Sequence, residues 1–123
     1  MTATYPTASL GLSSGTEALH IQVQSPVDSQ TLQSTLEGAL AQQPFPAGVV
    51  VDLSAVDFIE SSGLGGLVAL HKRCQQVPVP VVFLSPQAYV LKLMTITRLD
   101  KVLILADSMA EVDSKLQNSP SAL

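Results

Sequence analysis

The chain has 123 residues, of which 46% are hydrophobic and 13% charged, and its formal net charge is −4. This length fits one domain that buries a core without disulfides, and the composition is not that of a disordered chain. The acidic balance gives no basic field for phosphates, so we expect no binding to nucleic acid. A single cysteine, Cys74, excludes an internal disulfide and a zinc site of two cysteines and two histidines.

No segment has the pattern of a signal peptide or a membrane-spanning helix. The first residues lack a positive charge followed by an apolar stretch, and every apolar run is interrupted within about seven residues. A lone cysteine fits a reducing compartment. We therefore expect a cytoplasmic protein that does not insert into a membrane.

The N-terminal part of the chain predicts two strands and a helix. Residues 1–16 form a weak N-terminal strand or arm, with the strand signal at 9–12. Alternating apolar and polar residues at 18–23 predict a half-buried strand. Asp28 or Ser29 then caps a helix, because its side-chain oxygen accepts from free N–H groups of the first turn. Leucines at fourfold spacing form the apolar stripe of this helix: Leu32, Leu36 and Leu40.

A second strand-to-helix unit follows. The β-branched run at 49–53 does not alternate, which is typical of a strand covered on both faces. After a turn, apolar residues recur with helical period between Leu64 and Cys74.

A third unit predicts a strand at 79–84 and a helix capped by Ser85 with Pro86 as its first residue. This helix runs to about residue 97 with Leu91 and Met94 facing inward.

The last elements are a short buried strand at 102–106 and a helix opened by Ser108. The alternation of strands and helices predicts an α/β fold, with a mixed, mostly parallel sheet of about four or five strands and about four helices packed against it. The domain occupies residues 17–117, and 118–123 form a flexible tail.

The segment 57–66, DFIESSGLGG, joins a buried strand to an amphipathic helix at the sheet end where ligands bind. A helix N-terminus carries partial positive charge and unpaired N–H donors, so a phosphate on a serine there is stabilised. The glycines let another protein approach the backbone closely. The simpler alternative is structural: Ser61 or Ser62 caps the helix, and glycine packs it against the sheet.

Enzyme signatures fail at this segment. A nucleophile elbow needs glycine two positions before the serine, where Ile59 and Glu60 stand. The two histidines are His20 and His71, and His71 lies on the apolar face of the predicted helix, where a packed histidine is expected.

Phosphate-binding and metal-binding patterns fail as well. Val68 stands where a dinucleotide-binding loop needs its third glycine, and no Gly-Lys-Ser/Thr occurs. Asp52 ends a strand and Asp57 lies in a turn, so these carboxylates with Glu60 do not suggest a magnesium site. We expect no enzyme, no metal and no cofactor.

Residues 49–65, VVVDLSAVDFIESSGLG, resemble the signature of STAS domains, the family of bacterial anti-sigma factor antagonists. The family pattern is a hydrophobic strand ending in Asp-Leu-Ser, a spacer, and then Asp-Ser-Ser/Thr-Gly-Leu-Gly. The resemblance extends to 84–90 and 97–100, and Asp28 stands where the family has the Asp of a Gly-x-Leu-Asp turn. It covers about residues 18–116.

The resemblance implies a single STAS-type domain that switches partners. Ser61, with Ser62 as second choice, would be phosphorylated by an anti-sigma factor that is a serine kinase of histidine-kinase-like fold. A serine/threonine phosphatase would reverse the reaction, and the unphosphorylated domain would bind its partner. The implied partner-binding residues are Asp28, Asp57, Glu60, Ser61, Ser62, Gly63, Leu64, Gly65 and Ser85.

Two departures from the family pattern leave an alternative open. Glu60 stands where the family usually has Asp, and the loop before Asp28 lacks the usual glycine. The alternative is a STAS domain without a phosphorylation switch, as a subunit of a lipid transporter or a sensor of a small ligand. A hydrolase is a distant third reading.

Overall fold

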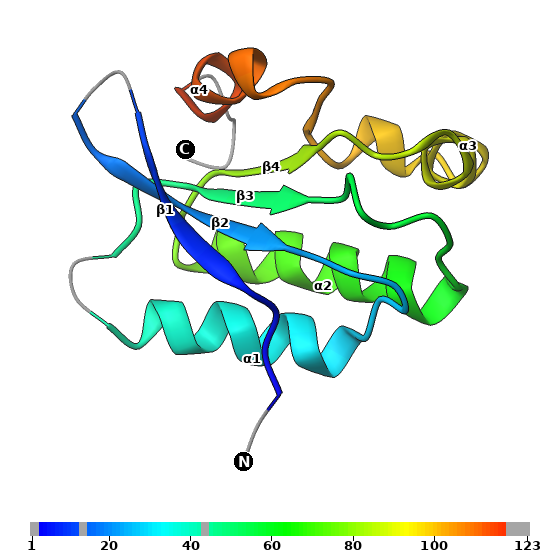
Figure 1. The fold of residues 1–123 in the computed structure, drawn as a ribbon, viewed down its shortest axis with the longest axis horizontal. Helices are drawn as coiled ribbons and strands as arrows, with labels where there is room; N and C mark the ends of the chain where they lie inside the picture. Colours follow the sequence, from blue (N-terminus) through cyan, green and yellow to red (C-terminus); the bar gives the residue numbers. More distant parts are fainter. Residues whose placement is uncertain (1–2, 13–14, 43–44, 118–123) are drawn as a thin grey trace.

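A computed structural model describes residues 3–12, 15–42 and 45–117 (Figure 1). Its five-stranded sheet has the order β1-β2-β3-β4-β5. The first pair is antiparallel and the other pairs are parallel, which confirms the predicted α/β fold with a mixed, mostly parallel sheet. The predicted flexible tail at 118–123 lies outside the described residues.

The elements follow one another along the chain as predicted, with one additional short helix. They are β1 (Thr7–Gly11), β2 (Glu17–Gln22), α1 (Ser29–Leu40), β3 (Val49–Asp52), α2 (Ser61–Gln76), β4 (Val81–Leu84), α3 (Ala88–Ile96), the 3-10 helix η1 (Leu99–Lys101), β5 (Leu105–Ala106) and α4 (Met109–Gln117).

Helices cover both faces of the sheet. In Figure 1, α1 and α2 lie side by side below the strands, and α4 lies above them. Val49 and Val51 belong to the larger hydrophobic cluster beneath, and Val50 belongs to the smaller cluster against α4. All three side chains are fully buried, which confirms that β3 is covered on both faces. Each such burial stabilises the fold by about 1.5–3 kcal/mol.

The starts of α1, α2 and α3 gather at one end of the sheet. Figure 1 shows the arrowheads of β2, β3 and β4 pointing toward this end, and α3 lies beyond it. The end of a parallel sheet toward which its strands run is where α/β proteins bind ligands and partners. The fold therefore brings three strand-to-helix loops to one surface.

The predicted start of α3 is wrong. The helix begins at Ala88 with Gln87 as its N-cap, and Ser85 adopts a left-handed backbone conformation with φ 53°. The cause is tertiary: the Ser85 N–H donates to Ala106 O at 2.8 Å, which continues the pairing of β4 with β5 by one residue. Ser85 therefore cannot cap a helix.

Two further expectations in this region are wrong. Leu91 is 37% exposed, and Val90 packs into the core with Met94 instead. The strand predicted at 102–106 is reduced to Leu105–Ala106, because Arg98 adopts a left-handed conformation after α3 and the chain then forms η1.

Candidate functional site

Hydrogen bonds tie the three loops at the carboxyl ends of the strands to one another. The Ser25 hydroxyl, after β2, donates to Asp57 Oδ1 in the loop after β3 at 3.0 Å. The side-chain amide of Gln87, before α3, donates to the carbonyl oxygen of Ser54 at 2.6 Å. No local pattern in the sequence indicates either hydrogen bond. Together they join the loops into a continuous surface.

The serines of the motif lie in the first turn of α2 with unused hydroxyl groups. Ser61 is the first helical residue, and Glu60 is the N-cap without a side-chain capping bond. Both Ser61 and Ser62 are exposed, and within the described chain neither hydroxyl has a hydrogen-bond partner. The expectation that one of them caps the helix is wrong. The first helical bond runs from Leu64 N–H to Glu60 O, so the preceding N–H groups lack intrahelical acceptors.

The glycines of the motif have two different roles. A Cβ on Gly63 would lie 3.2 Å from the carbonyl oxygen of Val27, and one on Gly66 would lie 2.9 Å from Ser29 Cα. These glycines let α2 pack closely against the start of α1, whereas the structural alternative expected glycine to pack the helix against the sheet. A Cβ on Gly65 would meet nothing within 4 Å, and this residue is exposed. Gly65 therefore leaves the backbone open beside Ser61.

Asp28 caps α1, as predicted. One carboxylate oxygen accepts from the Thr31 N–H at 3.0 Å and also from the Thr31 hydroxyl. These hydrogen bonds hold the pKa of Asp28 below its usual range, and the bond from the Thr31 hydroxyl has the larger effect. The Asp28 N–H donates to the Tyr5 hydroxyl, which in turn donates to the Pro26 carbonyl. The N-terminal arm, which gave only a weak signal in the sequence, therefore holds the loop before α1.

Asp52 anchors the loop after β3. Burial alone would raise its pKa, but hydrogen bonds from the Ser54 hydroxyl and N–H, at 2.7 and 2.9 Å, and from His20 outweigh burial and lower it. The His20 Nε2 atom lies 2.9 Å from Asp52 Oδ2. Asp52 therefore remains a carboxylate and fixes the first turn of the loop.

The implied partner-binding residues divide into six that are exposed and three that are buried or partly buried. Gly63 and Leu64 are buried, and the Ser85 hydroxyl donates to the Asp107 carbonyl oxygen at 3.0 Å. These three residues position the loops. The remaining ones are exposed and lie in the two neighbouring loops and the first turns of α2: Asp28, Asp57, Glu60, Ser61, Ser62 and Gly65.

An aromatic pair that the sequence did not indicate lies on this surface. The rings of Phe58 and Tyr89 are stacked, with centroids 5.9 Å apart and planes 19° from parallel. Their exposed fractions are 48% and 47%. Phe58 belongs to the motif loop and Tyr89 to the first turn of α3, so only the folded arrangement brings them together.

The buried titratable residues of α2 are not poised for chemistry. Burial lowers the pKa of His71, whose Nδ1 atom has no hydrogen-bond partner in the described chain. Burial raises the pKa of the Cys74 thiol to about 12. Across the residues that the structure describes, no three His, Cys, Asp or Glu side chains form a group that could hold a metal ion.

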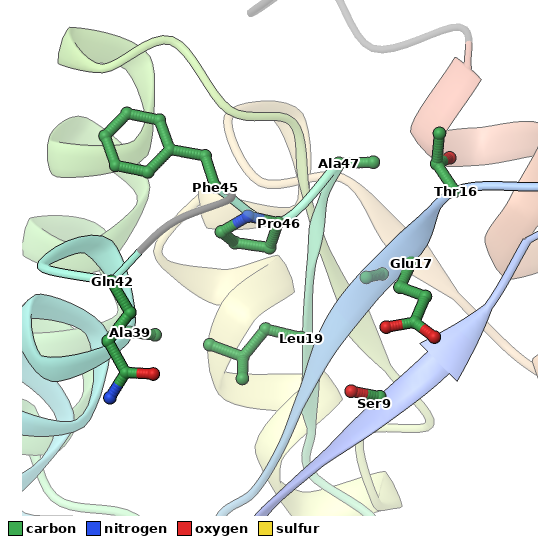
Figure 2. Close-up of a pocket in the computed structure, with 10 residues that line it drawn as sticks. Ser9, Thr16, Glu17, Leu19, Ala39, Gln42, Phe45, Pro46 and Ala47 are labelled. Carbon is green, nitrogen blue, oxygen red and sulfur yellow. The ribbon is translucent and has the colours of Figure 1, made fainter.

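A separate cavity of about 570 Å³ lies at the opposite end of the sheet. Figure 2 shows Ser9 and Glu17, from the β1–β2 pair, on one side and, on the other, Ala39 from α1 and Gln42 just after that helix. Leu19 lies between them. The walls are mostly apolar, and the Glu17 carboxylate is the charged group among the lining residues.

The structure is a small α/β domain that presents an exposed surface built from strand-to-helix loops. No helix within 3–12, 15–42 and 45–117 is long and apolar enough to cross a membrane. A family model, the STAS domain, matches residues 15–112. The chain therefore belongs to the STAS domain family.

Solved structures share this fold at low sequence identity. A candidate anti-sigma factor antagonist from Thermotoga maritima is 16% identical, covers 91% of this chain and 95% of its own, and gives a TM-score of 0.72. An anti-sigma factor antagonist domain protein from Planctomyces limnophilus is 18% identical, with coverages of 94% and 100% and a TM-score of 0.65. SpoIIAA in its unphosphorylated form is 14% identical, with coverages of 86% and 92% and a TM-score of 0.59. Comparison with curated proteins gave no match.

Proposed function

We propose that this STAS domain is a protein-binding module controlled by phosphorylation of Ser61. The observation that carries the proposal is the Ser61 hydroxyl, which is exposed in the first turn of α2 and has no hydrogen-bond partner in the described chain. A kinase needs such an accessible hydroxyl. The free N–H groups of the first turn would stabilise the phosphate that results.

The charge of this phosphate would control binding. It adds about −1.5 to −2 charges at neutral pH beside the exposed carboxylates of Asp57 and Glu60. A partner that fits the unphosphorylated surface would then face like-charge repulsion or an unmatched charge that it must desolvate. The unphosphorylated form is therefore the one that binds.

The partner in this proposal is an anti-sigma factor that is also a serine kinase of histidine-kinase-like fold, and a serine/threonine phosphatase reverses the modification. The switch would operate in the cytoplasm, where ATP is available to the kinase. Support comes from family membership and from the likeness to SpoIIAA, which was solved in an unphosphorylated form.

We propose binding as the activity of this module in place of enzymatic catalysis. A serine nucleophile needs an adjacent base, commonly histidine, to take its proton. His20 pairs with Asp52, His71 is buried, and neither donates to or accepts from the Ser61 hydroxyl.

The experiment that tests the proposal is phosphorylation by a purified anti-sigma kinase with magnesium and ATP. We expect one added phosphate on the peptide containing Ser61, no phosphate in Ser61→Ala, and normal phosphorylation in the matched control Ser62→Ala. Ser61→Asp should weaken binding to the kinase. Phosphate found only at another residue, or equal binding of Ser61→Asp, would contradict the switch.

A second candidate function, sensing of a small ligand without phosphorylation, is favoured by the cavity in Figure 2. Its volume lies within the usual range for ligand pockets, about 300–1,000 Å³. A small amine with an apolar body would match the apolar walls and the Glu17 carboxylate. Titration with phenethylamine, followed by NMR, should shift the amides of Glu17 and Leu19, and Glu17→Gln should weaken that shift. Absence of any shift would remove this candidate.

A further inference from the structure

The stacked pair of Phe58 and Tyr89, here called the aromatic patch, is an exposed apolar feature with no role in the core. Large aromatic side chains usually bury most of their surface, whereas these two leave nearly half exposed. Neither residue belongs to the two hydrophobic clusters of the core. The two side chains therefore contribute little to the stability of the fold, although they expose a large apolar surface to water.

The aromatic patch is rigidly placed. Phe58 belongs to the loop that starts at the Asp52 anchor, and the Gln87 side chain ties this loop to the start of α3 beside Tyr89. Two aromatic rings held in a stack need little ordering when a partner binds, so they lose little entropy. Tyrosine, with tryptophan and arginine, is among the residues most enriched at the energetic centres of protein interfaces.

The patch lies within reach of any protein that acts on Ser61. Phe58 precedes Ser61 by three residues, so their Cα atoms are at most about 11 Å apart. A partner in a specific complex covers about 800 Å² on each side, which corresponds to a patch roughly 30 Å across. A kinase that docks over the Ser61 hydroxyl can therefore cover the aromatic patch as well.

Charge complements this apolar centre. Asp57 and Glu60 flank the Phe58 side of the patch in sequence, both are exposed, and neither has a cationic partner in the described chain. The surface thus presents an apolar centre next to an acidic border. It fits a partner with an apolar side chain at its centre and lysine or arginine beside it.

We propose that the aromatic patch is the docking anchor for the kinase that phosphorylates Ser61. This inference rests on the proposed function. It adds to that function the residues, other than Ser61 itself, that bind the kinase. An apolar side chain of the kinase packs on the Phe58 and Tyr89 rings, and its basic residues face Asp57 and Glu60. The contact forms before phosphate transfer and persists through it, so it contributes equally to substrate binding and to the transition state.

The test is steady-state phosphorylation of the full chain by purified anti-sigma kinases of the histidine-kinase-like fold with magnesium and ATP. Uniform binding changes KM and leaves kcat unaltered. We expect Phe58→Ala and Tyr89→Ala each to raise KM about 5- to 30-fold at constant kcat. Tyr89→Phe, which keeps the ring, should keep the wild-type KM.

Val102→Ala is the control, because Val102 is 52% exposed and belongs neither to the aromatic patch nor to the loop that carries Ser61. It should leave both constants unchanged. Salt separates the two parts of the surface: the effect of Phe58→Ala should persist at high salt, whereas that of Glu60→Gln should shrink.

The outcomes separate this inference from the proposed function. Wild-type protein without phosphate on Ser61 would overturn both. Phosphorylation of Phe58→Ala and Tyr89→Ala with unchanged KM would overturn the docking anchor alone. A loss of kcat at constant KM would also overturn it, because the rings would then act on the reacting groups. Circular dichroism and thermal unfolding of each variant establish that the fold is retained.

Discussion

Two strand-to-helix junctions of the sheet look alike in sequence and differ in structure. Each follows a buried parallel strand and carries a serine shortly before or within the start of the next helix. At the junction between β3 and α2, the Ser61 hydroxyl is exposed and unbonded in the described chain. At the junction between β4 and α3, the Ser85 N–H donates to the carbonyl oxygen of Ala106, and the Ser85 hydroxyl donates to that of Asp107.

The difference arises from where strand pairing stops. After β3 the last ladder bond is made by Leu53, and the chain then turns away through a longer loop before α2 begins at Ser61. After β4 the ladder with β5 includes Ser85 itself, and only Pro86 and Gln87 precede α3. A serine is available to a partner only where the loop separates it from the sheet.

The largest change in stability is expected from substitutions at the glycines of α2, which form part of the first junction. Gly63→Ala forces a Cβ to within 2.8 Å of Ile59 Cγ1 and 3.2 Å of the Val27 backbone. We expect a loss of about 1–3 kcal/mol in the free energy of unfolding. Gly65→Ala, where a Cβ meets nothing within 4 Å, should raise stability by about 0.5–1 kcal/mol. Urea unfolding of both variants tests this difference between Gly63 and Gly65. Equal changes in the free energy of unfolding would contradict it.

The next effect separates the two serines. Ser85→Ala loses the hydrogen bond to Asp107 and keeps the left-handed backbone, so we expect a loss of about 1 kcal/mol. Ser85→Gly relieves the left-handed strain and should lie closer to wild type. Ser61→Ala should change stability by less than about 0.5 kcal/mol. Thermal unfolding of the three variants decides this, and a large loss in Ser61→Ala would show that its hydroxyl has a structural role.

A smaller effect tests whether the two junctions are linked. Gln87→Ala removes the 2.6 Å hydrogen bond to the Ser54 carbonyl and should cost about 0.5–1 kcal/mol. It should also shift the NMR amide signals of the loop after β3. Gln75→Ala, at an exposed position on α2, is the control. Unchanged signals around Ser54 in Gln87→Ala would mean that the junctions are independent.

The smallest effect is a pH response confined to one junction. Asp52 ends β3, whereas the paired residue of β4 is Leu84, which cannot ionise. The pKa of Asp52 is lower in the folded chain, so its contribution to stability is fully present above 3.8, the ordinary pKa of an aspartate side chain. That contribution is lost as the pH falls through the lower, folded-state value. The protection factor of the Ser54 amide, which is the measured exchange rate corrected for the intrinsic rate at each pH, should therefore fall on acidification before that of the Ser85 amide does. A simultaneous fall of both protection factors would contradict the anchor role of Asp52.

Local sequence patterns were enough to predict most of the elements and the position of the motif. The cap at Asp28, the double burial of β3 and the strand-to-helix motif each depend on residues close together in the chain. The Ser25–Asp57 and Tyr5–Asp28 bonds join residues 32 and 23 positions apart, and no local pattern encodes them. The stack of Phe58 on Tyr89 likewise required knowledge of which loops meet. The error at Ser85 has the same origin, because Ser-Pro is a good helix start until a neighbouring strand takes the serine N–H.

The bond network of Tyr5 has a practical consequence for handling the protein. Its N–H donates to Thr35 on α1, and its hydroxyl bridges Pro26 and Asp28 before that helix. A truncated version that starts at β1 would lose these hydrogen bonds, and a bulky fusion partner attached to the first residues would disturb them. Affinity handles for interaction assays therefore belong at the other terminus, so that a weak pull-down reports on the partner and not on a loosened loop.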